Sequence, residues 1–111
     1  MAYNSEYLTL VAPFGGPLGG ALWKLDTIDA TADVDTAGYI SDAKAKGMRK
    51  GDIVIVRIWP TSLPTEDSEL LSADGATSDL TSVGLHWVIG MSTAGAADLT
   101  ATLAITATNA D

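Results

Sequence analysis

This 111-residue sequence contains few arrangements of residues that could carry out catalytic chemistry. His86 is the only histidine, which rules out a metal site with two histidine ligands. A Ser-His-Asp catalytic group needs a nucleophile on a sharp turn, and the sequence contains no G-x-S-x-G motif. His86 alternates with the apolar residues Leu85 and Trp87, so we expect its side chain to face solvent or a neighbouring subunit. We therefore predict no catalytic residues and no enzymatic activity.

A group of acidic residues raises the possibility of calcium binding. The group consists of Asp26, Asp29, Asp33 and Asp35. Calcium takes about six to eight oxygen ligands from a flexible loop. The spacing lacks the every-other-residue order of such loops, and Asp35 also fits the start of a helix. The glycine pairs at 15–16 and 19–20 are separated by proline and are not followed by Lys-Ser or Lys-Thr, so they do not form a phosphate loop. We predict no metal and no cofactor.

Three tryptophans, Trp23, Trp59 and Trp87, each fall in a segment with strand character. Tryptophans in strands serve as anchors of a core or of a subunit interface. They also form platforms on which sugar rings stack. The sequence leaves both interpretations open, as an interface or as a glycan contact.

The composition limits the classes of partner. The chain has 14 acidic and 6 basic residues, for a formal charge of −8, which argues against binding to nucleic acid or to anionic lipid. Five of the basic residues lie between Lys44 and Arg57, and they form either a basic spot for an acidic partner or a solvated turn. The chain is 47% hydrophobic, with a mean hydropathy of +0.22. For so small a chain, this apolar content predicts that part of the surface meets a partner.

Other features of the sequence indicate the cellular compartment. The sequence has no cysteine, so it forms no disulfide. No apolar run approaches the roughly 20 residues of a membrane span, and the N-terminus has no positively charged signal region. We expect a product that is made in the cytoplasm and has no membrane partner.

The stretch from Asp35 to Pro60 organises the predicted fold. Tyr39, Ile40 and Ala43 are spaced to share one face of a helix over residues 36–46. Asp35 or Thr36 is expected to cap this helix, and Gly47 to end it in a left-handed conformation. Lys44 and Lys46 lie in its last turn, where cations suit the helix dipole.

A turn at residues 51–52 then leads into the strongest strand of the sequence, residues 53–59. This run is apolar at nearly every position, so we expect a central strand covered on both faces, with Ile55 in the core.

The flanking segments also predict β structure. Residues 5–12 and 21–26 read as strands, joined by an extended arm or wide loop with two prolines and four glycines. Residues 61–79 read as a long loop with one short strand or helical turn near 68–72. Residues 80–91 and 99–108 read as a hairpin with strict alternation. In the first hairpin strand the expected core residues are Val83, Leu85, Trp87, Ile89 and Met91.

These elements predict one domain over residues 1–111, with an N-terminal strand and arm at 1–20 and a core at 21–111. The expected fold is mainly β: a small antiparallel β-sandwich or barrel with one short α-helix at about 36–46 and an extended N-terminal arm.

Residues 1–58 resemble a family of small virion proteins of tailed bacteriophages that infect alphaproteobacteria. The likeness rests on the opening MAYNSEYLTLVAPFGG, then DVDTAGY at 33–39, Gly-Met at 47–48 and Gly-Asp-Ile at 51–53. The resemblance implies a structural component on the capsid surface, as decoration, cement or head-fibre protein. A tail or neck component and a carbohydrate-binding, receptor-binding module are the alternatives.

The implied partner is the major capsid protein, with other head-fibre or tail proteins as further candidates and a homotrimer as the expected oligomer. The N-terminal segment is suited to lying along another chain's sheet edge. Its predicted capsid or subunit contacts are Tyr3, Tyr7, Leu8, Leu10, Pro13, Phe14, Pro17 and Leu18.

Overall fold

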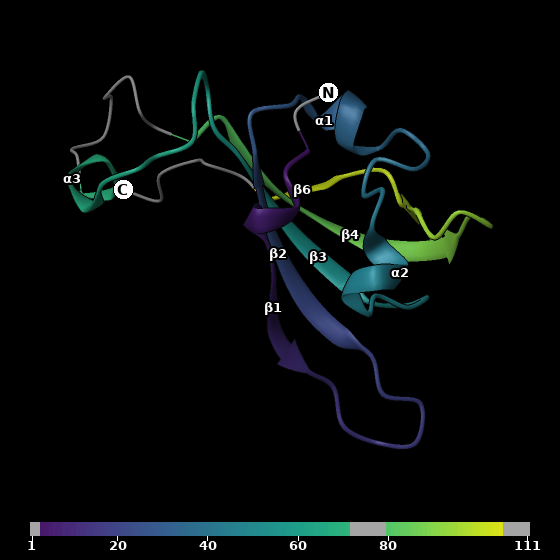
Figure 1. Ribbon diagram of the computed structural model, residues 1–111. Coiled ribbons are helices and arrows are strands. Elements are labelled where there is room, and N and C mark those ends of the chain that lie inside the picture. Colours follow the sequence, from purple (N-terminus) through teal and green to yellow (C-terminus); the bar gives the residue numbers. More distant parts are fainter. Residues whose placement is uncertain (1–2, 72–79, 106–111) are drawn as a thin grey trace.

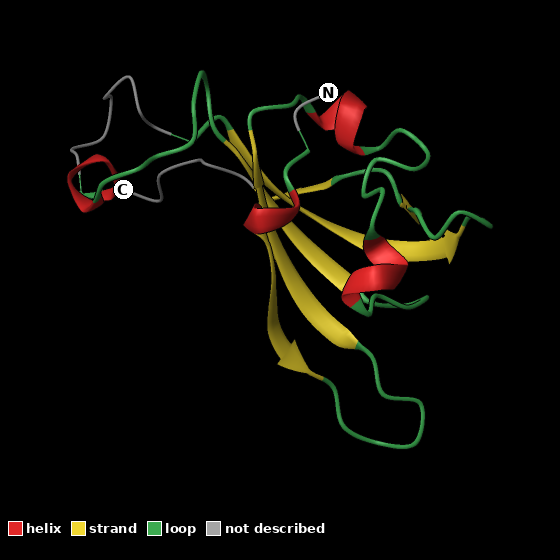
Figure 2. Cartoon of the chain, in the orientation of Figure 1, coloured by secondary structure: helices red, strands yellow, loops and turns green. Residues whose placement is uncertain are grey.

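Six strands form one sheet, and the helices of the segment between the second and third strands lie over one of its faces, whereas the helix at Asp67–Leu70 lies apart from the sheet (Figures 1 and 2). The computed structural model of the chain describes residues 3–71 and 80–105. In chain order the elements are η1 (Ser5–Tyr7), β1 (Leu8–Pro13), β2 (Ala21–Thr27), α1 (Thr31–Val34), α2 (Ala43–Lys46), β3 (Ile53–Ile58), α3 (Asp67–Leu70), β4 (Ser82–Met91), β5 (Ala97–Leu99) and β6 (Leu103–Ile105). The prediction of a mainly β fold is confirmed, and the architecture is consistent with the class of small sandwiches and barrels.

The sheet is mixed rather than wholly antiparallel. Its strand order is β1-β2-β3-β4-β5, and β6 pairs with the first half of β4. β2 and β3 run parallel, whereas the other pairs described are antiparallel. A parallel pair requires a crossover, and residues 28–52 provide it, carrying α1 and α2 across one face of the sheet. The antiparallel prediction did not allow for this crossover.

The core lies between that face of the sheet and the crossover. We call this face the covered face. The strands contribute Leu8, Trp23, Leu25, Val54, Val56, Ile58, Val88 and Leu99. The crossover contributes Val34, Tyr39, Ile40, Ala43 and Met48. The apolar side chains of the crossover reach the sheet only if the crossover lies flat on the strands. Burial of these side chains therefore fixes the path of the crossover.

Only the last turn of the single helix predicted at 36–46 forms, as α2, while α1 lies just before the predicted range. Gly38 interrupts the predicted helix, with a φ of +79° and its N–H donated to Asp98. Ile40 then forms a bridge to Ala97 of β5, so tertiary hydrogen bonds replace helical ones. Asp35 is the C-cap of α1 rather than the start of a helix. The predicted end is confirmed, because Gly47 is the left-handed C-cap of α2.

Strand β3 occupies the predicted central position, with β2 and β4 as neighbours. The prediction that both its faces are covered is wrong. Val54, Val56 and Ile58 are buried, whereas Ile53 is exposed and Ile55 only half-buried. Ile55 therefore lies outside the core.

The N-terminal strand prediction is confirmed by β1, which pairs with β2 along an irregular register. The glycine-proline segment is the wide loop of this hairpin and projects beyond the sheet (Figure 1). The helical turn expected near 68–72 is α3, while residues 72–79 and 106–111 lie outside the described part of the chain.

Candidate functional site: an open apolar face of the sheet

The sheet face opposite the crossover carries a patch of apolar side chains, bordered by Lys24, Asp26 and Arg57, which strand register places on the same face. Strand register places Ile53 beside Trp87 and Ile55 beside Leu85 on β3 and β4. Residues paired in this way point to the same face of a sheet. The face, here called the open face, comprises Leu22, Ile53, Ile55, Val83, Leu85, Trp87, Ile89, Leu103 and Ile105.

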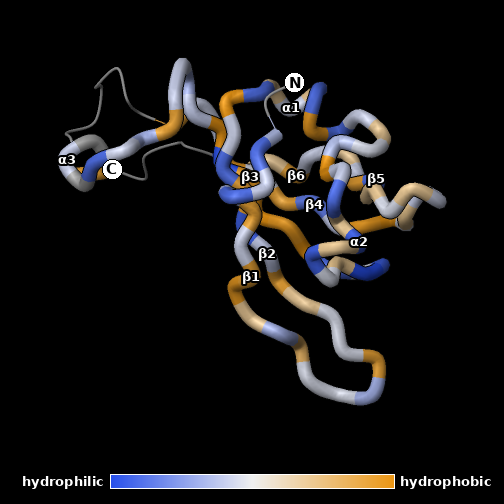
Figure 3. The backbone as a smooth tube through the Cα atoms, in the orientation of Figure 1, coloured by the Kyte–Doolittle hydropathy of each residue, from blue (hydrophilic) through white to orange (hydrophobic). Residues whose placement is uncertain are grey.

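The largest of these side chains are left in solvent. Trp87 is 52% exposed and Leu103 66% exposed. They border a shallow hollow of about 350 Å³ whose floor includes Leu85 and whose rim includes Ile53 and Ala101. In Figure 3 the strands β2, β3 and β4 carry apolar stretches, whereas the turn after α2 is hydrophilic. A contiguous apolar patch of this kind is typical of a surface that binds another protein.

The outward orientation of β4 is the reverse of the predicted one. The alternating apolar set from Val83 to Met91 was expected to face the core, but from 83 to 89 the buried residues are Gly84, His86 and Val88. Met91, which follows a register shift between Val88 and Gly90, does pack against the core. The physical reason is the crossover, which already supplies enough bulk to fill the covered face. Small or polar side chains of β4 fit beneath it, so the larger ones face outward.

His86 is consequently buried, with 3% of its surface exposed, and not on the solvent side as predicted. Its Nδ1 lies 2.9 Å from the carbonyl oxygen of Thr100 and 3.2 Å from Oδ1 of Asp35. Its Nε2 lies 3.4 Å from the hydroxyl of Thr102, and that hydroxyl donates to Asp35. These contacts satisfy both ring nitrogens and tie β4 to the end of α1 and to the segment before β6.

Two of the three tryptophans belong to the core. Trp23 and Trp59 are each 5% exposed. The indole N–H of Trp23 donates to Asp52 at 2.9 Å, and that of Trp59 donates to Asp26 at 3.1 Å. Trp87 alone reaches the open face, so the three do not form a common platform for a sugar or an interface.

Asp26 and Asp52 are the buried acids that hold these indoles. Asp26 also accepts two hydrogen bonds from Arg57, at 2.6 and 3.0 Å. Burial by itself would raise the pKa of Asp26, but the bonds from Arg57 and Trp59 outweigh it and lower the pKa. Asp52 accepts from the backbone N–H groups of Ala21 and Arg49, both at 3.1 Å. Sequence patterns gave no signal for either role.

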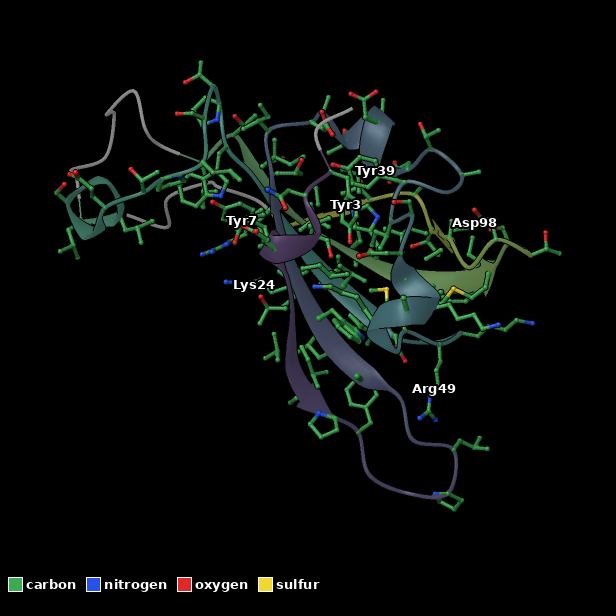
Figure 4. The ribbon with its side chains drawn as sticks, viewed as in Figure 1. Tyr3, Tyr7, Lys24, Tyr39, Arg49 and Asp98 are labelled. Atoms are coloured by element: carbon green, nitrogen blue, oxygen red, sulfur yellow. The ribbon has the colours of Figure 1, made fainter. Side chains whose placement is uncertain are left out.

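The predicted N-terminal contact residues divide into two groups. Tyr3 donates its hydroxyl to Asp42 and packs edge-on against Tyr39, as Figure 4 shows. Tyr7 is half-buried, and Leu8 lies in the core. The second group is exposed on the β1–β2 hairpin and comprises Leu10, Pro13, Phe14, Pro17 and Leu18.

Within residues 3–71 and 80–105, no cluster of three or more His, Asp or Glu side chains gathers that could hold a metal ion. Asp35 of the acidic group contacts His86 and Thr102, and Asp29 accepts from Tyr39. No helix in the same ranges is long and apolar enough to cross a membrane.

Comparison with protein-family models, curated proteins and solved structures finds no match to this chain.

Proposed function

We propose that this chain is a non-enzymatic structural protein of a tailed-phage virion, a capsid decoration, cement or head-fibre protein that binds the shell of major capsid protein. The observation that carries the proposal is the open face. Covering its apolar side chains with another protein lowers the free energy by about 25 cal/mol for each Å² removed from water. The resemblance of residues 1–58 to virion proteins supplies the class of partner.

The fold supports a passive role. The contacts of His86 and of the buried aspartates all lie within the fold, and they hold strands and loops together. A protein of this kind stabilises the shell through the contact area that its many copies bury, rather than through catalysis. We propose that its copies associate as trimers, because hexamer-based shells offer three-fold positions.

A tail or neck position would use the same open face, and imaging of intact particles would separate it from the head position. A carbohydrate-binding role has less support, because Trp87 is the one tryptophan of the three that is exposed.

Rebinding of the purified protein to capsids stripped of it tests the proposal. Trp87→Glu places a charge in the centre of the open face and is expected to weaken binding at least tenfold, a loss of about 1.4 kcal/mol or more. Ile28→Glu is the matched control, since Ile28 is 40% exposed in the connection after β2 and lies off this face. Full occupancy by Trp87→Glu, or equal loss with both variants, would contradict the proposal.

A further inference from the structure

A second concave surface lies on the opposite side of the sheet from the open face. The β1–β2 hairpin extends past α2, and a groove of about 190 Å³ opens between them. Leu10, Pro13 and Trp23 line it from the hairpin. Gly47 and Arg49 line it from the turn that joins α2 to β3. At Gly47 a side chain would meet no atom within 4 Å, so the mouth of the groove is open.

Arg49 gives the groove an unpaired cation. Its side chain is exposed and makes no hydrogen bond or ion pair with the residues that the structure describes. In Figure 4 it points from the turn toward the β1–β2 loop, and its Nη1 lies 3.5 Å from the position that a Cβ on Gly19 would occupy. The five N–H donors of this guanidinium are therefore available to a ligand.

The other charges at the groove are already engaged. Lys46 donates to the carbonyl oxygens of Ser5 and Leu8, so its charge stays at the site while these bonds hold its ammonium in place. Asp52 is 1% exposed and accepts three N–H groups. The groove therefore offers the free guanidinium of Arg49 beside the apolar side chains of Leu10, Pro13 and Trp23.

We propose that this groove binds a short acidic segment of a partner protein, with one carboxylate on Arg49 and a neighbouring apolar side chain against Leu10, Pro13 and Trp23. A guanidinium pairs with a carboxylate through two parallel hydrogen bonds. The small volume fits about one side chain, and a single guanidinium matches one carboxylate rather than the many phosphates of a nucleic acid. The site does not depend on the virion assignment, because it lies on the other side of the sheet.

The test uses the full-length ¹⁵N-labelled chain and two synthetic peptides, acetyl-Ala-Leu-Glu-Leu-Ala-amide and its counterpart with Gln in place of Glu. The Glu peptide is expected to shift the amide signals of Gly20 and Gly47 and the indole signal of Trp23. The Gln peptide is expected to bind about tenfold more weakly, because it lacks the charge.

Two variants with the same change in net charge complete the test. Arg49→Gln is expected to weaken binding of the Glu peptide about tenfold. Lys50→Gln removes an adjacent exposed cation that does not line the groove, and is expected to leave binding within about twofold of wild type, as for a charge outside the contact. The proposal is overturned by equal effects of the two variants, by equal binding of the two peptides, by absence of shifts at millimolar peptide, or by equal shifts with inorganic phosphate.

Discussion

At the scale of single residues, buried aspartates hold strands and loops together through hydrogen bonds, a role that sequence patterns attribute to apolar packing. Asp52 precedes β3 and accepts hydrogen bonds from Trp23, Ala21 and Arg49. It therefore joins three separate points: the start of β2, the indole of a core tryptophan and the turn after α2. The sequence shows only a Gly-Asp turn at this place, because hydrogen-bond partners about 30 residues away leave no local pattern.

Asp52→Ala is predicted to lower the free energy of unfolding by about 3 kcal/mol, since it leaves buried N–H donors without an acceptor. Asp33→Ala, in the first turn of α1, removes a half-exposed carboxylate and should cost less than about 1 kcal/mol. Urea unfolding followed by tryptophan fluorescence measures both. If the Asp52 variant proves as stable as the Asp33 variant, the network assigned to Asp52 does not hold.

At the scale of elements, sequence patterns predicted where most strands run but not which way they face. The alternation in residues 82–91 marked β4 correctly. Its direction could not be predicted, because the assumption that apolar residues face the core fails when a crossover already fills one side and the other side is apolar and uncovered. The parallel β2–β3 pair was missed for a related reason. The crossover that joins this pair is held by contacts distant in sequence, such as the hydrogen bond from the N–H of Gly38 to Asp98, which is 60 residues away.

Gly84 on β4 shows how tightly one element fits another. A Cβ at this position would lie 2.3 Å from Cγ2 of Thr102, far inside contact distance. Gly84→Ala should therefore cost about 1–3 kcal/mol of unfolding free energy through overpacking.

The double variant Gly84→Ala with Thr102→Ser removes the clashing methyl group while keeping the hydroxyl that bonds Asp35. It should be less stable than Thr102→Ser alone by under about 1 kcal/mol, as expected when two groups in contact are coupled. Urea unfolding of the four proteins completes the cycle. Additive losses would show that the methyl group is not what excludes a side chain at residue 84.

At the scale of the whole molecule, one face of the sheet is covered by the crossover and the other is exposed. The crossover from Val34 to Met48 buries the covered face, while Trp87 and Leu103 stand in solvent on the open face. The apolar excess of the sequence predicted such a surface, and its candidate contacts were the N-terminal segment together with Trp23, Trp59 and Trp87. Of the three tryptophans, Trp87 lies on the open face. Tyr3 and Leu8 of the N-terminal segment also help to build the fold.

The projecting part of the N-terminal hairpin remains a candidate for a second contact. Leu18 at its tip is 91% exposed. Deleting residues 1–20 would not isolate its role, because the deletion also removes β1 and the core residue Leu8. Only the loop after β1 is separable from the fold.

The central claim is that another protein covers the open face once the chain is assembled on a particle. Hydroxyl-radical footprinting of the free chain and of the particle-bound chain tests it most directly, with oxidation of Trp87 as the readout and oxidation of Ile28 as the internal reference. We predict that Trp87 is oxidised readily in the free chain and is protected severalfold on the particle, because burial removes it from solvent. Equal oxidation of Trp87 in the two states, with Ile28 unchanged, would contradict the claim.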